Sequence, residues 1–325
     1  MPERAPVVVL GEALVDVTLG RDGSIESHPG GAPVNVAVGL SRLGIPTTLG
    51  AQLGDDPAGQ LVRAHLDAAG VVLDALPPHR RTSSAVATLD DRGRATYEFD
   101  LVWDPQRLPS FLDAPLVYVG SIGATVPPGA DAVASWAQQA HAAGVPVAVD
   151  PNLRPSLTPR LAPLRRRIEA MTAHAWLVKC SDEDAAVMAP GVDVEDLLVR
   201  WLSDGAGVGV AVVTLGADGA MLASPLAMVR VAAPPVEVVD TIGAGDSFMA
   251  ALLAGLLLRG WCGRDDLDAD ELAAVGDAAA AAAALTCSRA GADPPWRREL
   301  DVAAAVASAR SHLRAPQSRG PHPKP

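Results

Sequence analysis

The residues best suited to chemistry lie in a glycine-rich segment, Asp240–Phe248, which reads Asp-Thr-Ile-Gly-Ala-Gly-Asp-Ser-Phe. We expect it to follow a strand over Val236–Val239 and to open a long apolar helix. Glycines let the backbone pass close to a ligand, and the free N–H groups of a first helical turn attract anions. Asp246 would lie in that turn, where a carboxylate acts either as a base or as a helix cap. The segment therefore predicts an anion site with an acid beside it.

A second glycine pair, Gly30-Gly31, introduces another expected helix and places Asn35 on its first turn. An asparagine there either hydrogen-bonds a ligand hydroxyl or caps the helix. Asp16, which we place at the end of the first strand, is similarly ambiguous, although open α/β sheets hold their ligands at strand ends.

These residues need a scaffold, and apolar β-branched runs alternate with helix-like segments along the chain. The expected strands are Val7–Leu10, Thr47–Gln52, Leu116–Val119, Val145–Val149, Trp176–Val178 and Val210–Thr214, with a later meander over Gly219–Ser224 and Met228–Val231. The expected helices are Pro33–Leu43, Ala58–Ala69, Ala130–Ala143, Leu161–Thr172, Ala244–Arg259, Ala269–Thr286 and Val302–Leu313. This alternation predicts an α/β fold of three layers, a doubly wound, mostly parallel sheet with helices on both faces.

Two stretches interrupt the alternation. Ser84–Leu89 and Arg94–Phe99 flank a turn-rich link and read as a β-hairpin, and Thr18–Ser27 reads as a second one. We expect them to form a small β-sheet lid, from about residues 17–28 and 84–103, that excludes water from a cleft. A surface flap without a gating role is the alternative. One domain is expected over residues 1–313, followed by a disordered tail over 314–325.

The charge and the apolar runs exclude two classes of partner. A formal net charge of −12 argues against nucleic acid, which requires a basic face. The longest late apolar run, Ala278–Leu285, is too short to span a membrane, and the N-terminus lacks the features of a signal peptide. The three cysteines form no C-x-x-C pair. We therefore expect a cytoplasmic protein.

Several enzyme classes lack their required residues. The only lysines, Lys179 and Lys324, fit neither a P-loop nor the strand lysine of a protein kinase. Gly205–Gly209 precedes its strand and lacks dinucleotide-binding spacing. The seven histidines are scattered and form no His-Glu-x-x-His.

The two glycine-rich segments, Gly30–Asn35 through Gly44 and Asp240–Asp246, together resemble the signatures of the ribokinase-like (PfkB) carbohydrate kinase family. Further segments fall in the family's order: Gly54–Gly59, Asp150–Arg154, Lys179–Ser181 and Thr214–Gly219. The resemblance covers the chain up to about residue 310 and implies an ATP-dependent kinase that acts on a sugar.

The resemblance also implies roles for the matching residues. It makes Asp246 the general base and makes the amides of Gly243, Ala244, Gly245 and Asp246 the hole for the transferred phosphate. The acceptor sugar is expected to contact Asp16, Gly30, Gly31, Asn35, Arg154 and Asp246. The nucleotide is expected beside Lys179, Ser181, Thr214, Gly216, Gly219, Gly243 and Gly245.

Two metal sites follow from the same resemblance. Relatives often have Asn-x-x-Glu where this chain reads Ser181-Asp182-Glu183-Asp184, so Asp184 is the residue expected to reach Mg²⁺ through water. Asp240 and Ile242 are expected near a monovalent cation, K⁺, together with the loop Thr286–Asp293.

Gly11–Asp16 and Asp150–Arg154 most resemble the corresponding segments of fructokinases, so fructose is the expected acceptor. 2-Keto-3-deoxygluconate kinase and ribokinase are the nearest alternatives, followed by a nucleoside (adenosine) kinase. A sugar-sensing homologue without catalysis is the alternative of another class. A phosphorylated acceptor would need a basic cluster, for which only Arg154 and Arg94 are available. As in dimeric relatives, the lid is expected to pair two subunits.

Overall fold

The computed structural model of the protein describes residues 5–20, 24–78, 80–89, 95–158, 160–203 and 207–313. The larger of two sheets has nine strands in the order β13-β12-β11-β10-β9-β8-β1-β4-β5. Its strands are β1 (Val7–Leu10), β4 (Thr47–Ala51), β5 (Val72–Ala75), β8 (Val117–Gly120), β9 (Val147–Asp150), β10 (Leu177–Ser181), β11 (Val210–Thr214), β12 (Ala220–Ala223) and β13 (Met228–Val231). Strands β11 to β5 run parallel, and the hairpin β12–β13 is antiparallel.

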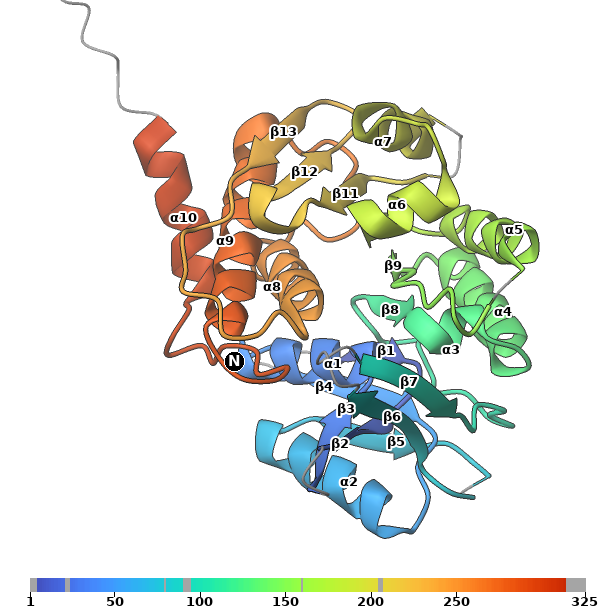
Figure 1. Ribbon diagram of the computed structural model, residues 1–325. Helices are drawn as coiled ribbons and strands as arrows, with labels where there is room; N and C mark the ends of the chain where they lie inside the picture. The colour runs from blue at the N-terminus through green and yellow to red at the C-terminus, as the bar shows by residue number, and fades with distance from the viewer. Residues whose placement is uncertain are drawn as a thin grey trace, which may run out of the picture.

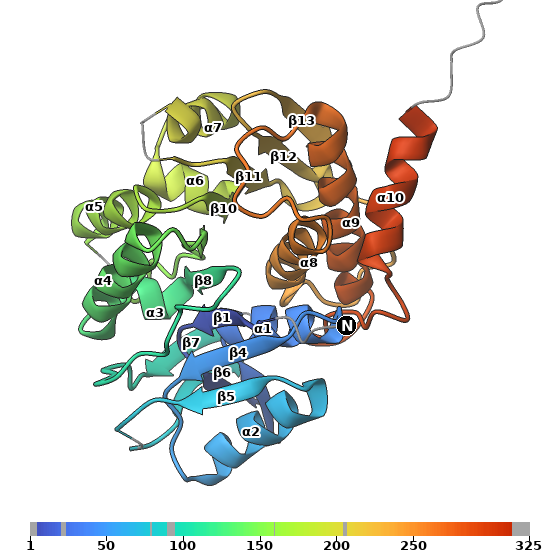
Figure 2. The same ribbon diagram turned by 180° about the vertical axis from the view of Figure 1, so that it is seen from behind.

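The central strands consist of short aliphatic residues because both faces of the sheet are covered. Every residue of β1 and β8 is buried, as is every residue of β9. One face packs on the helices α1 (Ala32–Arg42), α2 (Pro57–Ala69), α8 (Ala244–Leu258), α9 (Ala269–Cys287) and α10 (Val302–Leu313). The other face packs on α3 (Ser121–Thr125), α4 (Gly129–Ala142), α5 (Leu161–Thr172), α6 (Asp182–Met188) and α7 (Val194–Ser203). Figures 1 and 2 show these two helix groups on opposite sides, which confirms the three-layer α/β/α fold.

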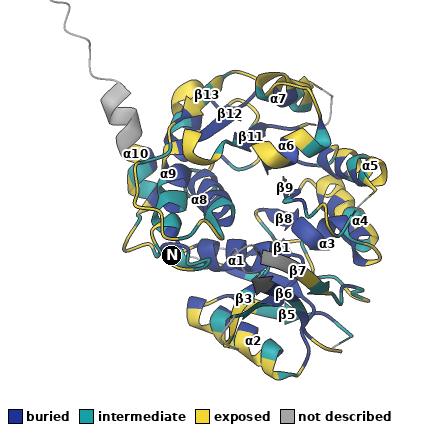
Figure 3. Cartoon of the chain, viewed as in Figure 1, coloured by how far each residue is buried: buried dark blue, intermediate teal, exposed yellow. Residues whose placement is uncertain are grey.

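Helix α8 is the buried helix that carries the expected anion site. Its residues from Asp246 to Leu256 are all buried, and it packs against α1 and α9 (Figure 3). A helix that is apolar on all sides is typical of a protein interior. The first turn of α8 is therefore held in a fixed position relative to the sheet.

The smaller sheet has four strands in the order β3-β2-β6-β7, formed by β2 (Leu14–Leu19), β3 (Ile25–Gly30), β6 (Ser83–Leu89) and β7 (Ala95–Asp100). The pairs β2–β3 and β6–β7 are antiparallel, as the two expected hairpins require, and β2 runs parallel to β6. The predicted small sheet is thus confirmed. The turn Asp90–Gly93 and the tail 314–325 lie outside the described residues.

Two expectations about the strands were wrong. Asp16 does not end the first strand, because β1 stops at Leu10 and Asp16 lies on β2, opposite His28. The segment Val236–Val239 forms no strand; it is a loop in which Val238 and Val239 are 60% and 62% exposed. Its β-branched residues resemble a strand, but the N–H groups of Val239 and Asp240 donate to the backbone oxygen of Cys287 at the end of α9 and not to a strand of the sheet.

Candidate active site

The parallel strands of the large sheet end in a row of polar or small residues. Gly120 and Asp150 are paired at the ends of β8 and β9, and Ser181 and Thr214 are paired at the ends of β10 and β11. Carboxyl ends of parallel strands form the ligand-binding edge of open α/β sheets. The structure therefore places the expected nucleotide residues Ser181 and Thr214 side by side at this edge.

Asp246 lies in the first turn of α8 and is 6% exposed. Its Oδ2 accepts a hydrogen bond from Asn35 Nδ2 at 2.8 Å, and its Oδ1 accepts one from Asn152 Nδ2 at 3.3 Å. Burial raises the pKa of Asp246, while Asn35, Lys179 and Arg154 oppose this rise. A buried carboxylate with a raised pKa is suited to accept a proton.

Gly243 is the N-cap of α8, with φ of 76°, and no side chain caps this turn. A Cβ on Gly243 would lie 2.5 Å from the Cβ of Ala292, so the turn needs glycine for both its conformation and its packing. The N–H groups of Gly245 and Asp246 in the first turn have no intrahelical acceptor four residues earlier, whereas Ala244 N–H donates to the backbone oxygen of Thr241 at 3.2 Å. The turn thus has the structure of an anion site.

Lys179 and Asp150 form a buried ion pair behind this turn. Lys179 Nζ lies 2.8 Å from Asp150 Oδ2, and the two residues are 3% and 0% exposed. Burial raises the pKa of Asp150 to about 6, against the opposing effect of Lys179. Burial alone would lower the pKa of Lys179, but Asp150 raises it above its ordinary value. A Cβ on Gly245 would lie 3.2 Å from Nζ, so the ammonium group borders the glycine turn.

The expected sugar-binding residues gather on the other side of Asp246. A Cβ on Gly30 would overlap Asp16 Oδ2, and Gly31 has φ of 104° with its Cβ position 2.8 Å from a backbone oxygen of Glu12. Burial raises the pKa of Asp16, opposed by Arg154 and His28. Because Arg154 also opposes the raised pKa of Asp246, the guanidinium lies within electrostatic reach of both acids.

Three residues at this site were not among the expected ones: Glu12, Tyr118 and Asn152. Glu12 is 2% exposed and its Oε2 accepts a hydrogen bond from Gly123 N–H at 2.7 Å, while its Oε1 and the Tyr118 hydroxyl have no partner among the described residues. Burial raises the pKa of Glu12 to about 7, and the hydrogen bond from Gly123 opposes this rise. Glu12 comes just after β1, at the carboxyl edge of the sheet, and this position in the sequence could have marked it as a site residue. Tyr118 was hidden within an apolar strand.

On the nucleotide side, two glycines shape the connection between β11 and β12. Gly216 has φ of 56°, and Gly219 has φ of 89° with a Cβ position 2.0 Å from the backbone oxygen of Val231. The Thr214 hydroxyl donates to the backbone oxygen of Cys180 at 3.4 Å. Both glycines therefore permit the tight turn that joins β11 to β12.

The residues expected near Mg²⁺ have structural partners of their own. Asp184 N–H donates to Ser181 Oγ at 3.0 Å, and Asp184 Oδ1 accepts from Leu153 N–H at 2.9 Å. The described residues hold no group of three or more His, Cys, Asp or Glu side chains able to bind a metal. Asp184 retains lone pairs for a metal-bound water, which fits a Mg²⁺ ion held mainly by nucleotide phosphates.

Asp240, expected near a monovalent cation, connects two loops. Its Oδ1 accepts from Ile242 N–H at 3.0 Å and its Oδ2 accepts from Gly291 N–H at 2.8 Å. It thereby fixes the loop after α9 against the segment that leads into α8.

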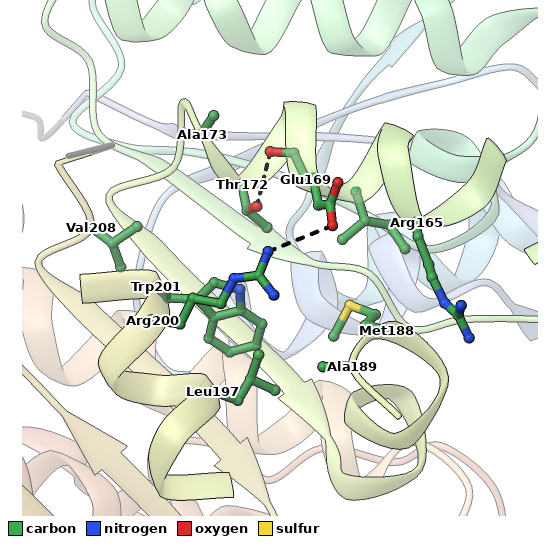
Figure 4. A pocket seen from close by; sticks show the side chains of 11 residues that line it. Arg165, Glu169, Thr172, Ala173, Met188, Ala189, Leu197, Arg200, Trp201 and Val208 are labelled. Atoms are coloured by element: carbon green, nitrogen blue, oxygen red, sulfur yellow. Dashed lines mark hydrogen bonds and ion pairs between the residues drawn. The ribbon is translucent and has the colours of Figure 1, made fainter. Parts of the chain in front are cut away.

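A separate cavity of about 230 Å³ lies among α5, α6 and α7 (Figure 4). It is lined by Met188, Leu197 and Trp201, with Arg200 ion-paired to Glu169 at its rim. None of the expected site residues lines this cavity, so we separate it from the active site.

Among the described helices, none combines the length and the apolar character needed to cross a bilayer.

Residues 5–298 match the model of the pfkB family carbohydrate kinase. A fructokinase from Klebsiella pneumoniae is 35% identical over 260 residues, which cover 78% of this chain and 84% of that protein. The structure of a fructokinase with bound ATP from Xylella fastidiosa matches with a TM-score of 0.79 at 26% identity, covering 95% of this chain and 98% of that one. The structure of an aminoimidazole riboside kinase from Salmonella enterica, complexed with aminoimidazole riboside and an ATP analogue, matches with a TM-score of 0.75 at 28% identity. The match covers 93% of this chain and 100% of that one.

The family expected from the two glycine-rich segments is thus confirmed. The chain belongs to the pfkB family of carbohydrate kinases, which are phosphotransferases with an alcohol group as acceptor.

Proposed function

We propose that this kinase phosphorylates a hydroxyl of free fructose with ATP, and that Asp246 is its general base. The observation that carries the proposal is the position of the buried Asp246 carboxylate, between the amide of Asn35 and the uncapped glycine turn that begins at Gly243. An acid and an anion site in one helical turn are what phosphoryl transfer to an alcohol requires.

In the proposed reaction, Asp246 accepts the proton of the acceptor hydroxyl as its oxygen attacks the terminal phosphorus of ATP. The bond from that phosphorus to the bridging oxygen breaks, and ADP leaves with the bond's electrons. The first-turn amides of α8 stabilise the charge on the transferred group, with the Lys179 ammonium behind them. Asp184 would hold Mg²⁺ through water, and the ion would neutralise phosphate charge when bound with the nucleotide. We also propose that Asp240 and Ile242 would hold K⁺ beside this turn.

The charges at the acceptor end favour a free sugar over a sugar phosphate. Asp16 and Asp246 are acidic, and the nearby Lys179 is already paired with Asp150. A phosphate on the acceptor would be repelled by these acids, and Arg154 alone would have to balance it. The 35% identity to the Klebsiella fructokinase supports fructose in particular.

The test is ADP formation with ATP, Mg²⁺ and K⁺ across fructose, ribose, 2-keto-3-deoxygluconate, adenosine, aminoimidazole riboside and fructose 6-phosphate. The proposal expects the highest kcat/KM with fructose, and loss of turnover in the Asp246→Asn variant. Preference for a riboside would replace fructose by a nucleoside acceptor. Silence across the panel, with ATP binding intact, would support a sugar sensor instead.

Two further parts of the proposal concern the protein as a whole. The lid sheet has β3 and β7 at its edges, and Ile25 on β3 is 69% exposed, so we expect the lid to pair with the lid of a second subunit. Light scattering of the purified protein tests this dimer.

The thiols of Cys180, Cys262 and Cys287 are all free, which agrees with a cytoplasmic location.

A further inference from the structure

Asn152 lies between the expected sugar-binding arginine and the proposed base. Its Oδ1 accepts a hydrogen bond from Arg154 Nη1 at 2.6 Å, and its Nδ2 donates to Asp246 Oδ1 at 3.3 Å. The residue follows β9 and has φ of 38°, a left-handed conformation that asparagine tolerates better than most residues. The chain bends at Asn152 so that its amide reaches both side chains.

The chemistry of the two neighbours decides which way this amide points. A guanidinium only donates hydrogen bonds, so the oxygen of Asn152 must face Arg154. An ionised carboxylate only accepts them, so the nitrogen of Asn152 must face Asp246. The reversed amide would set donor against donor and acceptor against acceptor. Arg154 therefore fixes the orientation of Asn152, and Asn152 in turn fixes one oxygen of Asp246.

The other oxygen of Asp246 is held by Asn35, at 2.8 Å. With one amide donor on each oxygen, the carboxylate cannot rotate without losing a hydrogen bond. Resting on the proposed function, we propose that Asn152 is a positioning residue for the base Asp246, and that Arg154 orients it. Arg154 thereby contributes to turnover as well as to binding of the acceptor.

Other charged groups around Asp246 stay in place when Asn152 is changed. Arg154 faces it from the same loop, Lys179 from β10, Asp150 from the end of β9 and Tyr118 from β8. A change in the pH dependence of Asn152→Gly, which adds no charge, therefore reports on the lost amide.

The experiment compares Asn152→Gly with Asn152→Asp. Both replacements accept the left-handed backbone, so thermal unfolding should show folded proteins. Asn152→Gly should lower kcat about tenfold to a hundredfold with little change in KM for ATP, because a carboxylate that is no longer held is misplaced. Asn152→Asp should shift the acidic limb of the kcat/KM profile to higher pH than in the wild type, because it sets a second carboxylate beside Asp246.

Arg154→Met, alone and combined with Asn152→Gly, tests the orienting role. The proposal expects the arginine change to lower kcat in the wild-type background and to add no more than about threefold in the glycine background. Wild-type kcat in Asn152→Gly, or a rise in the acceptor's KM with kcat unchanged, would overturn the positioning role. If Asp246→Asn itself retains turnover, the proposed function fails, and that result is separate from any outcome at Asn152.

Discussion

The side-chain amide of Asn35 donates to the Asp246 carboxylate at 2.8 Å, although 211 positions separate the two residues in the sequence. The contact exists because the first turns of α1 and α8 meet beside the carboxyl edge of the sheet. Each residue alone is an ordinary polar residue near a helix start. Together they form a buried acid with a dedicated donor.

Removing that donor should change the pH dependence of the kinase. Asn35→Ala keeps a good helix former in α1 but deletes a hydrogen bond that lowers the pKa of Asp246. The pKa of Asp246 should rise further, so activity is lost first on the acidic side. We expect kcat/KM to fall about tenfold to a hundredfold near neutral pH, as for a lost hydrogen bond to a charged group. A rate profile that matches the wild type between about pH 5 and pH 8 would contradict this.

Changing the proposed base should separate chemistry from binding. Asp246→Asn is expected to lower kcat by about two to four orders of magnitude, because the proton acceptor is lost. Nucleotide affinity, measured by calorimetry, should stay within a few fold. Asp277→Asn, on the exposed side of α9, is the matched control and should keep full turnover. Undiminished kcat in Asp246→Asn would remove this residue from the mechanism.

The glycine turn can be tested against a glycine of similar conformation. Gly243 has φ of 76° and its Cβ position collides with Ala292, whereas Gly260 has φ of 68° and open space around it. Gly260→Ala should cost only the backbone strain, about 1–2 kcal/mol of unfolding free energy. Gly243→Ala should destabilise by about 1–3 kcal/mol more, through overpacking, and should also lower kcat. Equal unfolding free energies and equal kcat in the two variants would show that the Ala292 contact is unimportant.

Glu12 predicts a pH dependence of stability. Its pKa is raised from 4.5 to about 7, so between these values the folded state holds a proton that the unfolded state has released. The free energy of unfolding therefore falls as pH rises through this window, by at most about 3 kcal/mol at about 1.4 kcal/mol per pH unit. Glu12→Gln cannot ionise and lacks this loss. Denaturant unfolding at pH 5 and pH 8 should show the variant gaining stability relative to the wild type as pH rises.

Much of the fold was predictable because its elements repeat a simple pattern. The bounds expected for α5 and α10 match the structure, and the other expected helices start or end within a residue or two. The helix α3 was missed because it has only five residues and begins at Ser121, whose φ of 55° carries no capping signal. The helix α6 has a capping box, Ser181 with Asp184, but Ser181 was interpreted as a nucleotide contact and part of a metal motif, and Asp184 as a metal residue, so the start of the helix was missed.

The site was predictable where glycine leaves a trace in the sequence. Gly243 and Gly31 mark turns that no other residue fits, and both lie where expected. The Lys179–Asp150 pair and the Arg154–Asn152–Asp246 series were not predictable, because each depends on which strand ends become neighbours. Spacing along the chain does not contain that information.

The order of the elements has a consequence for synthesis on the ribosome. Asn35 and the strand β1 emerge early, yet Asp246 and the Ala292 that supports its turn lie near the other end of the chain. The aliphatic residues of α1 pack against α8, which is made much later, and the residues Val7 and Val9 of β1 belong to the same apolar core. A nascent chain therefore exposes the apolar residues of β1 and α1 until α8 has been made. We expect chaperones to bind it most strongly before the last helices are translated.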